Sequence, residues 1–156
     1  MGHSKRFLWI LRHAKDSKKV TRPFLHLLWK GYQLFFGLDI PYDTKIGKGL
    51  YLGHAFNITV NGNAIIGDNC NLHKGCLIGQ ENRSGGGRKG SPVIGNKVWV
   101  GINAVIVGNF KIGDDVLIAP NSYVNCDVPS HSVVLGNPCI IKHKDNATES
   151  YVNNVV

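Results

Sequence analysis

The stretch YLGHAFNITVNG, residues 51 to 62, places His54 among apolar and small residues. An imidazole has a reference pKa of about 6.5, so it can take a proton from a reacting hydroxyl near neutral pH. The alternative is a surface histidine without a role. Which of these two interpretations holds depends on the structural element that carries His54.

A second group of residues, Cys70, His73 and Cys76, combines types that bind metals. Thiolates and imidazoles are the usual ligands of zinc. Free cysteine side chains are also often buried in a packed core, where they behave as small apolar groups. Their meaning also depends on the element that positions them.

An aliphatic residue recurs every six positions along most of the chain. Gly follows seven of these residues, which suits tight turns where a side chain would obstruct the backbone. Neither a helix nor an alternating strand has a period of six, so the pattern predicts a repeat architecture. The thirteen members are Ile40, Ile46, Leu52, Ile58, Ile66, Leu72, Ile78, Ile94, Val100, Ile106, Ile112, Ile118 and Val124.

The pattern resembles the hexapeptide repeat over roughly residues 40 to 128. The resemblance implies an all-β core, a left-handed parallel β-helix of about four coils. Each triangular coil then has three hexapeptides, with the aliphatic residues pointing inward. We expect a basic helical segment at 1–38, the β-helix domain at 39–142 and a tail at 143–156.

The six-residue step is broken twice, by two residues between Ile58 and Ile66 and by ten between Ile78 and Ile94. Grouping the series by three places both insertions after the third hexapeptide of a coil, so we predict that both leave the prism at the same edge. The larger insertion, QENRSGGGRKGS at 80–91, is expected to be a binding loop. Its Arg83 and Arg88 are either solvated, or meet phosphates or an anionic acceptor.

The repeat then places the candidate residues. His54 comes two residues after the inward Leu52, so it faces a groove edge and not the core. Cys70 and Cys76 each come four residues after an inward aliphatic, where the repeat has small residues, and we predict that they pack. His73 lies one coil beyond His54 and is expected to line an acceptor site.

The formal charge of +8 is concentrated at one end of the chain. Residues 1–38 hold eight basic residues and one acid, a net +7, so we expect no nucleic-acid partner. The longest early apolar run, FLWIL, is far too short for a membrane span. We therefore expect a cytoplasmic protein with four free thiols.

Apolar residues in the N-terminal segment recur at helical spacing and predict one or two helices, broken near Pro23. With tryptophans nearby and a positive charge, this suits a helix in a membrane interface, a peripheral contact at the inner membrane face. Alternatively, these faces pack on the β-helix or on a neighbouring subunit. The residues concerned are Phe7, Ile10, Leu11, Ala14, Phe24, Leu27, Leu28, Leu34 and Phe35.

Two longer segments, at 39–79 and 92–138, together resemble the serine acetyltransferase branch of the hexapeptide acyltransferases. In that family a histidine in an HA dipeptide is the general base, and an aspartate fifteen residues earlier orients it. The matching residues are His54, with Ala55, and Asp39. The resemblance also implies acetyl-CoA as the acyl donor, no metal, and a homotrimer.

The chain departs from the serine enzymes where they hold the charged groups of the amino acid. It has Gly53 where they carry an Asp, and Gly90 and Ser91 where they carry an Arg-His pair. Residues 1–38, which precede the repeat, are also fewer than the long helical domain found before the β-helix in those enzymes. We therefore expect a saccharide hydroxyl as acceptor, as in shorter relatives associated with surface polysaccharide synthesis, with serine O-acetylation as the alternative.

In this family the acyl donor binds along a groove between subunits, mostly through backbone groups and small residues. The corresponding positions here are Gly79, Ile102, Ala119, Gly136 and Pro138, with Lys142 near the nucleotide phosphates. Two remoter alternatives remain open. One is a gamma-class carbonic anhydrase, which needs three zinc-binding histidines where only His54 and His73 are suitably placed; the other is a non-catalytic binding protein.

Overall fold

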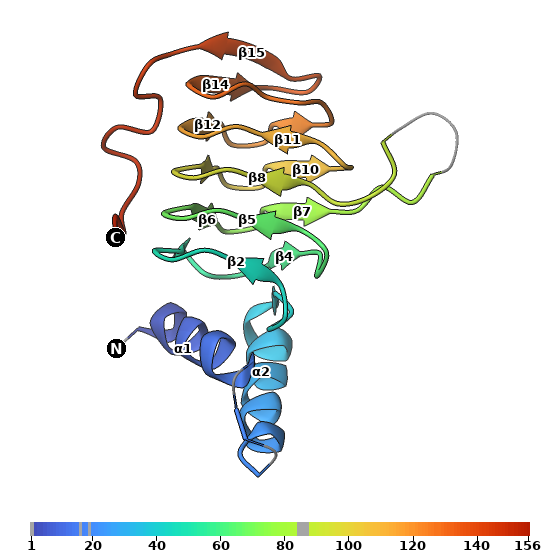
Figure 1. Ribbon diagram of the computed structural model, residues 1–156, viewed down its shortest axis with the longest axis vertical. Helices are drawn as coiled ribbons and strands as arrows, with labels where there is room; N and C mark the ends of the chain where they lie inside the picture. Colours follow the sequence, from blue (N-terminus) through green and yellow to red (C-terminus); the bar gives the residue numbers. More distant parts are fainter. Residues whose placement is uncertain (1, 16, 19, 84–87) are drawn as a thin grey trace.

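The computed structural model describes residues 2–15, 17–18, 20–83 and 88–156. Two helices, α1 (His3–Lys15) and α2 (Arg22–Phe36), lie beneath a column of short strands (Figure 1). The strands are β1 (Leu38–Asp39), β2 (Lys45–Ile46), β3 (Tyr51–Gly53), β4 (Ile58–Val60), β5 (Ile65–Ile66), β6 (Asn71–His73), β7 (Leu77–Gly79), β8 (Val93–Ile94), β9 (Trp99–Val100), β10 (Val105–Val107), β11 (Lys111–Ile112), β12 (Val116–Ile118), β13 (Tyr123–Val124), β14 (Ser132–Leu135) and β15 (Ile140–His143).

The strands form three sheets, one for each side of a triangular prism. Sheet A has the order β1-β4-β7-β10-β13, sheet B the order β11-β8-β5-β2, and sheet C the order β15-β14-β12-β9-β6-β3. All pairs are parallel except β14 with β15. Four coils, from β2-β3-β4 to β11-β12-β13, stack into the left-handed β-helix that the resemblance to the hexapeptide repeat implies.

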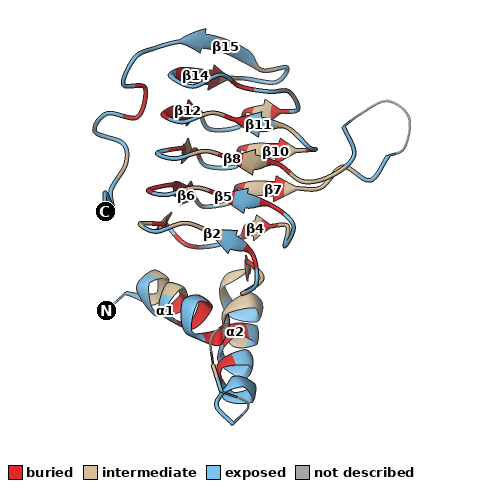
Figure 2. Cartoon of the chain, in the orientation of Figure 1, coloured by how far each residue is buried: buried red, intermediate tan, exposed pale blue. Residues whose placement is uncertain are grey.

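The aliphatic series forms the core of the prism. Twelve of its thirteen members are buried, and the thirteenth, Ile46, is half-buried against the core. Buried residues occur on every coil (Figure 2). Cys70 and Cys76 are also fully buried, which confirms the prediction that they pack. Burial raises the pKa of the Cys70 thiol to about 11 and of the Cys76 thiol to about 12, so both stay protonated.

The strand register corrects the predicted position of the smaller insertion. Val60, not Ile58, lies opposite Ile78 in sheet A, while Gly53 lies opposite His73 in sheet C. The two extra residues therefore fall in the turn from sheet C to sheet A, and the spacing from Val60 to Ile66 is a regular six. The period misleads here because Ile58 and Val60 both point inward and both are buried.

The two insertions thus lie on opposite sides of sheet A. The smaller one widens the turn between β3 and β4, which carries His54. The larger one leaves between β7 and β8, and an antiparallel bridge between Glu81 and Gly90 closes its base. Of its residues, 80–83 and 88–91 belong to the described part of the chain.

The helices close the lower end of the prism. Phe7, Ile10 and Leu11 of α1 join the core, and Trp29 of α2 donates from Nε1 to the Ile40 carbonyl oxygen at 2.8 Å. Pro23 lies in the first turn of α2, where its missing N–H costs nothing. The predicted packing on the β-helix is therefore confirmed for this part of the apolar pattern.

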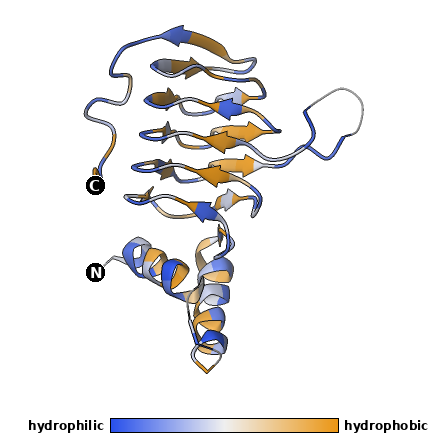
Figure 3. Cartoon of the chain, viewed as in Figure 1, coloured by the Kyte–Doolittle hydropathy of each residue, from blue (hydrophilic) through white to orange (hydrophobic). Residues whose placement is uncertain are grey.

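A second apolar set on α2 has no cover within the described residues. Phe24, Leu27, Leu34 and Phe35 are each more than 60% exposed, and apolar residues run along this helix as well as along the strands (Figure 3). In the part of the chain that the structure describes, neither helix is long and apolar enough to span a bilayer.

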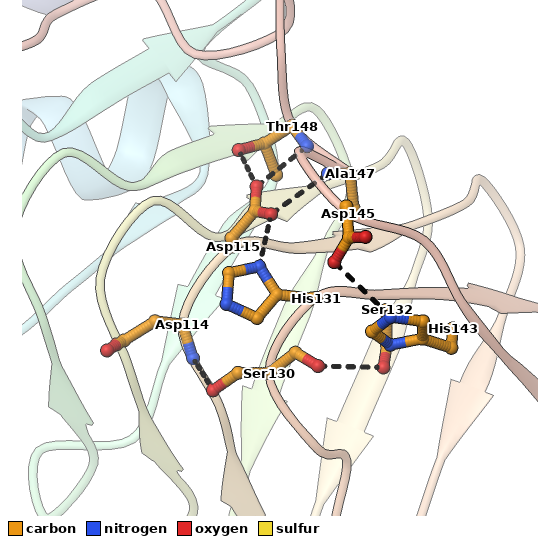
Figure 4. A network of polar contacts seen from close by, with 9 residues as sticks. All are labelled: Asp114, Asp115, Ser130, His131, Ser132, His143, Asp145, Ala147 and Thr148. Carbon is orange, nitrogen blue, oxygen red and sulfur yellow. Dashed lines mark hydrogen bonds and ion pairs between the residues drawn. The ribbon is translucent and has the colours of Figure 1, made fainter.

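The C-terminal tail returns from β15 down the side of the prism, against the direction in which the coils rise (Figure 1). Asp115, in the turn between β11 and β12, fixes its upper part by accepting hydrogen bonds from Ala147 and Thr148 (Figure 4). Lower down, Asn71 donates to the Tyr151 carbonyl oxygen, and Val156 donates to Asn69. The tail thereby links successive coils along the edge between sheets B and C.

Candidate active site

The candidate base lies on the edge where sheet C turns into sheet A, here called the His54 edge. Four residues, His54 to Asn57, fill a turn that takes only two residues in the next coil, Lys74 and Gly75. The corresponding turns of the higher coils contain Ile102, Pro120 and Gly136, in the register set by Leu52, Leu72, Val100, Ile118 and Val134. These residues form one line up the prism.

His54 is exposed, as its offset from Leu52 predicts. Its backbone is in the left-handed region, with φ of 48°, and Asn57 in the same turn has φ of 52°. Few residues other than Gly adopt this conformation. The extra residues and these two conformations lift the imidazole out of the wall of the prism.

The turn is supported from below by α1. Ala55 is buried beside His54, and His3 donates from Nε2 to the Ala55 carbonyl oxygen at 3.2 Å. The His3 ring stacks on Phe36 and contacts Phe56 at a tilt, with ring centroids 4.9 and 5.2 Å apart. The wide turn is therefore held by packing, while the His54 side chain stays open to solvent.

Asp39 lies on the neighbouring strand. It is the second residue of β1 and lies opposite Thr59 of β4, in the strand that follows the His54 turn. Its half-buried carboxylate accepts a hydrogen bond of 2.6 Å from Gln33 Nε2 of α2. No hydrogen bond between Asp39 and His54 occurs among the described residues, so the expected pair is near in topology but not joined.

His73 is the last residue of β6, directly above Gly53 in sheet C and thus next to the His54 turn. Its ring packs against Trp99, with centroids 4.6 Å apart, and lies 6.3 Å from the Tyr51 ring. Burial, followed by the charge of His54, lowers the pKa of His73. His73 is therefore a neutral group at physiological pH beside the exposed His54.

The loop arginines lie on the other side of sheet A. Arg88 pairs with Asp127 and lies over the Phe110 ring, 5.2 Å from its centroid. With Arg83 and Glu81 it lines a cavity of about 210 Å³ over Val107 and Tyr123. Within one chain the structure does not bring Arg83 or Arg88 to His54 and His73.

Three of the six positions expected to contact the acyl donor lie on the His54 edge: Ile102, Ala119 and Gly136. Pro138 is exposed in the turn that follows β14, and Lys142 is exposed on β15 opposite Val133. Gly79 ends β7, at the side of sheet A from which the loop leaves. The structure thus supports a shared line for three of these residues and leaves Gly79 apart from it.

The sequence argument missed Lys74, one coil above His54, and the aromatic pair Tyr51 and Trp99, whose rings lie beside His73. Lys74 is exposed in the coil directly above His54, and its offset from Leu72 equals that of His54 from Leu52. The two-residue offset from Leu72 would therefore have been sufficient to identify Lys74. The aromatic pair could be found only from the strand register. In the described residues, no cluster of three His, Cys, Asp or Glu side chains is suited to a metal ion.

Comparisons with known proteins agree with this architecture. Residues 91–126 match the family model described as bacterial transferase hexapeptide (six repeats). Serine acetyltransferase 4 of Arabidopsis thaliana is 38% identical over 125 residues, covering 72% of this chain and 35% of the relative. A serine acetyltransferase of Staphylococcus aureus is 35% identical over 113 residues, covering 72% and 52%.

Solved structures give the same result. Serine acetyltransferase from Brucella abortus in complex with coenzyme A has a TM-score of 0.77 and 30% identity, over 90% of this chain and 56% of that one. Soybean serine acetyltransferase complexed with serine has a TM-score of 0.72 and 31% identity, over 87% and 56%. The chain spans about half of these relatives, or less. Its β-helix is a hexapeptide-repeat domain related in sequence and in fold to the serine acetyltransferases.

Proposed function

We propose that the protein is an O-acetyltransferase that uses acetyl-CoA, with His54 as its general base. The observation that carries this proposal is an exposed imidazole, without a hydrogen-bond partner among the described residues, on an edge of a hexapeptide-repeat domain whose relatives are acetyltransferases. The edge above His54 offers small or apolar residues, including Ala119 and Gly136. Such residues let an extended thioester arm lie close to the backbone.

In the proposed reaction the acceptor hydroxyl attacks the thioester carbonyl carbon. His54 takes the hydroxyl proton as the new C–O bond forms, since an alcohol is a poor nucleophile without a base. The tetrahedral intermediate then expels the thiolate of coenzyme A, and this thiolate takes the proton from the imidazolium. Asp39 would orient the imidazole and stabilise its charged form once the side chains close on substrate.

For the acceptor, we propose here only that it carries a reactive hydroxyl group. The names of the relatives favour serine, because several are serine acetyltransferases and one structure contains serine. Gly53, Gly90 and Ser91 favour a saccharide, because they leave an amino acid without ionic partners at these positions.

Release of free thiol from acetyl-CoA, measured against serine, simple sugars, nucleotide sugars and oligosaccharides, tests this function. We expect saturable release with at least one acceptor. It should fall by a factor of about 10² or more in His54→Ala, the usual contribution of a general base. Unchanged release in that variant would overturn the role of His54.

A homotrimer is part of the proposal. The outward positions of sheet A hold Leu77, Val105, Val107 and Tyr123, all half-buried in the single chain, and an apolar sheet face of this kind suits a protein interface. The His54 edge and the loop with Arg83 and Arg88 flank this same sheet. In a ring of three, the loop of one chain would therefore approach the His54 edge of the next. Light scattering should give three times the chain mass, and a monomer at micromolar concentration would contradict it.

We also propose contact with an anionic lipid surface through α2. Its exposed Leu34 and Phe35 belong to a segment in which basic side chains such as Arg6, Lys18 and Arg22 are exposed. Each basic residue near anionic lipid contributes about 1 kcal/mol, and salt screens this attraction. The double variant Leu34→Ser/Phe35→Ser should bind such vesicles less at low salt. Binding that is absent in the original chain, or unaffected by the variant, would refute this contact.

A further inference from the structure

Gly53 is a glycine because another side chain occupies its place. A Cβ atom at residue 53 would lie 2.3 Å from His73 Nδ1 and 2.4 Å from His73 Cε1, far inside any normal contact. The backbone of Gly53 does not require a glycine, since its φ is not positive. The His73 imidazole therefore fills the space immediately before His54 that a side chain at residue 53 would otherwise take.

The His73 ring is held where it lies. Trp99 packs against it in the next coil, and the ring of Tyr151 from the tail meets Trp99 edge-on at 5.4 Å. His73 Nε2 is buried and has no hydrogen-bond partner among the described residues. A buried polar atom of this kind is costly and needs an explanation. This position constrains which nitrogen carries the proton.

Because the ring is neutral, only one of its nitrogens carries a hydrogen. Aromatic faces are negative, so an N–H beside them is better tolerated than a lone pair. Nε2 is the buried nitrogen of a ring that packs against Trp99, and on this argument it is the nitrogen to which the proton is assigned. Nδ1, the atom at Gly53, then keeps its lone pair and accepts hydrogen bonds beside His54.

We propose that Gly53 and His73 together select an uncharged polyhydroxy acceptor, such as a saccharide. His73 Nδ1 accepts a hydrogen bond from a second hydroxyl of the acceptor, while His54 takes the proton of the reacting one. A carboxylate in this place would meet the lone pair of Nδ1 and gain no partner, so the same pair disfavours an amino acid. This inference rests on the proposed O-acetyltransferase function and deepens it.

The steric part can be tested without activity. Gly53→Ala should lower the Tm by about 3 °C or more, because the new methyl group overlaps the His73 ring. His73→Ala in the same chain should remove most of that loss, while the two changes would be additive if the residues did not meet. Nitrogen chemical shifts of His73 in the intact protein should show the Nε2–H form at neutral pH. The opposite tautomer, or additivity of the two substitutions, would overturn the inference.

The specificity part compares kcat/KM for serine and for neutral saccharides. His73→Leu should lower kcat/KM for saccharides by about tenfold or more, and His73→Gln, which keeps an acceptor atom, should retain part of it. The double variant Gly53→Asp/His73→Ala should shift the ratio towards serine. If the original chain prefers serine and His73→Leu leaves the ratio unchanged, this inference fails while the proposed function stands. If no acceptor supports turnover that depends on His54, the proposed function itself fails.

Discussion

Two edges of the prism each carry a histidine, and the two side chains have opposite surroundings. At the edge between sheets B and C, His131 lies 2.9 Å from the Asp115 carboxylate through Nδ1. The same carboxylate accepts hydrogen bonds from the Ala147 amide, the Thr148 amide and the Thr148 hydroxyl, at 2.7 to 2.9 Å (Figure 4). At the His54 edge the imidazole is exposed and has no such partner in the described chain.

The difference separates structural from chemical use of one residue type. Asp115 accepts three hydrogen bonds from the tail and one from His131, so its two oxygens are fully used and none of their capacity is left for a substrate. His54 stands on a widened turn in the left-handed backbone region, and in the part of the chain that the structure describes its exposed ring has no hydrogen-bond partner. A histidine joined to an aspartate is therefore not sufficient evidence for a catalytic pair in this molecule. His54, which makes no such contact among the described residues, is the better candidate for a general base.

Removal of the Asp115 carboxylate should have the largest effect on the docking of the tail at the edge between sheets B and C. Asp115→Ala leaves the Ala147 and Thr148 amides without a partner, and hydrogen bonds to a charged group contribute about 1.5 to 3 kcal/mol. We expect the tail to open, with much faster hydrogen exchange of these two amides and little change in the β10 amides. Equal acceleration in both regions would show that Asp115 supports the whole prism.

Acid should weaken the same hydrogen bonds from Ala147, Thr148 and His131 to Asp115, here called the clasp. Burial alone raises the pKa of Asp115, but hydrogen bonds from Thr148, His131 and Ala147 outweigh it, so the pKa is lowered. A lowered pKa means that the clasp stabilises the fold above the ordinary value of about 3.9 and weakens as the pH falls through the lowered one. The Thr148 amide signal should follow this transition below about pH 4. In Asp115→Asn the transition should be absent, and its persistence there would assign it to another group.

Asp39 allows a test of the other edge. Asp39→Ala should lower kcat by about tenfold, equivalent to about 1.4 kcal/mol, if the carboxylate orients His54 during turnover. Gln33→Ala is the matched control, because it removes the only hydrogen bond to the Asp39 carboxylate among the described residues and leaves the carboxylate in place. Equal losses in both variants would mean that Asp39 acts only through the packing of α2.

The smallest effect is expected from His131→Ala. The side chain is half-exposed and supplies one of four hydrogen bonds to Asp115, so its loss should cost about 0.5 to 1.5 kcal/mol of tail docking. Chemical denaturation followed by tail amide signals would measure this. A loss as large as that of Asp115→Ala would mean that the hydrogen bond between His131 and Asp115, and not those from Ala147 and Thr148, decides whether the tail stays docked.

The sequence was sufficient for the repeat and for most of the core. Ile, Leu or Val at every sixth position can be buried only if the chain folds into coils, and Cys70 and Cys76 follow as small core residues. It was insufficient for the turn that carries His54. Ile58 and Val60 both point inward, so the period could be continued from either, and only the pairing of Val60 with Ile78 places the extra residues.

The candidate site was predictable in part. The offset of His54 from Leu52 gave its exposure, and the same offset would have given Lys74. The contact between His73 and Gly53 depends on strand register and on one rotamer, which no spacing reveals. The clasp around Asp115 joins a turn to residues more than thirty positions later, and the tail has no repeat that would announce it.

The central proposal is that the exposed His54 acts as the general base, whereas His131 only supports Asp115, the residue that holds the tail. The most direct test is kcat/KM of His54→Ala and His131→Ala, measured side by side with the acceptor that gives saturable thiol release from acetyl-CoA. We predict a loss of about 10²-fold or more for His54→Ala with an unchanged Tm, and a rate within about twofold of the original for His131→Ala, whose distance from the His54 edge leaves the barrier untouched. Equal losses in the two variants, or a larger loss in His131→Ala, would contradict the account.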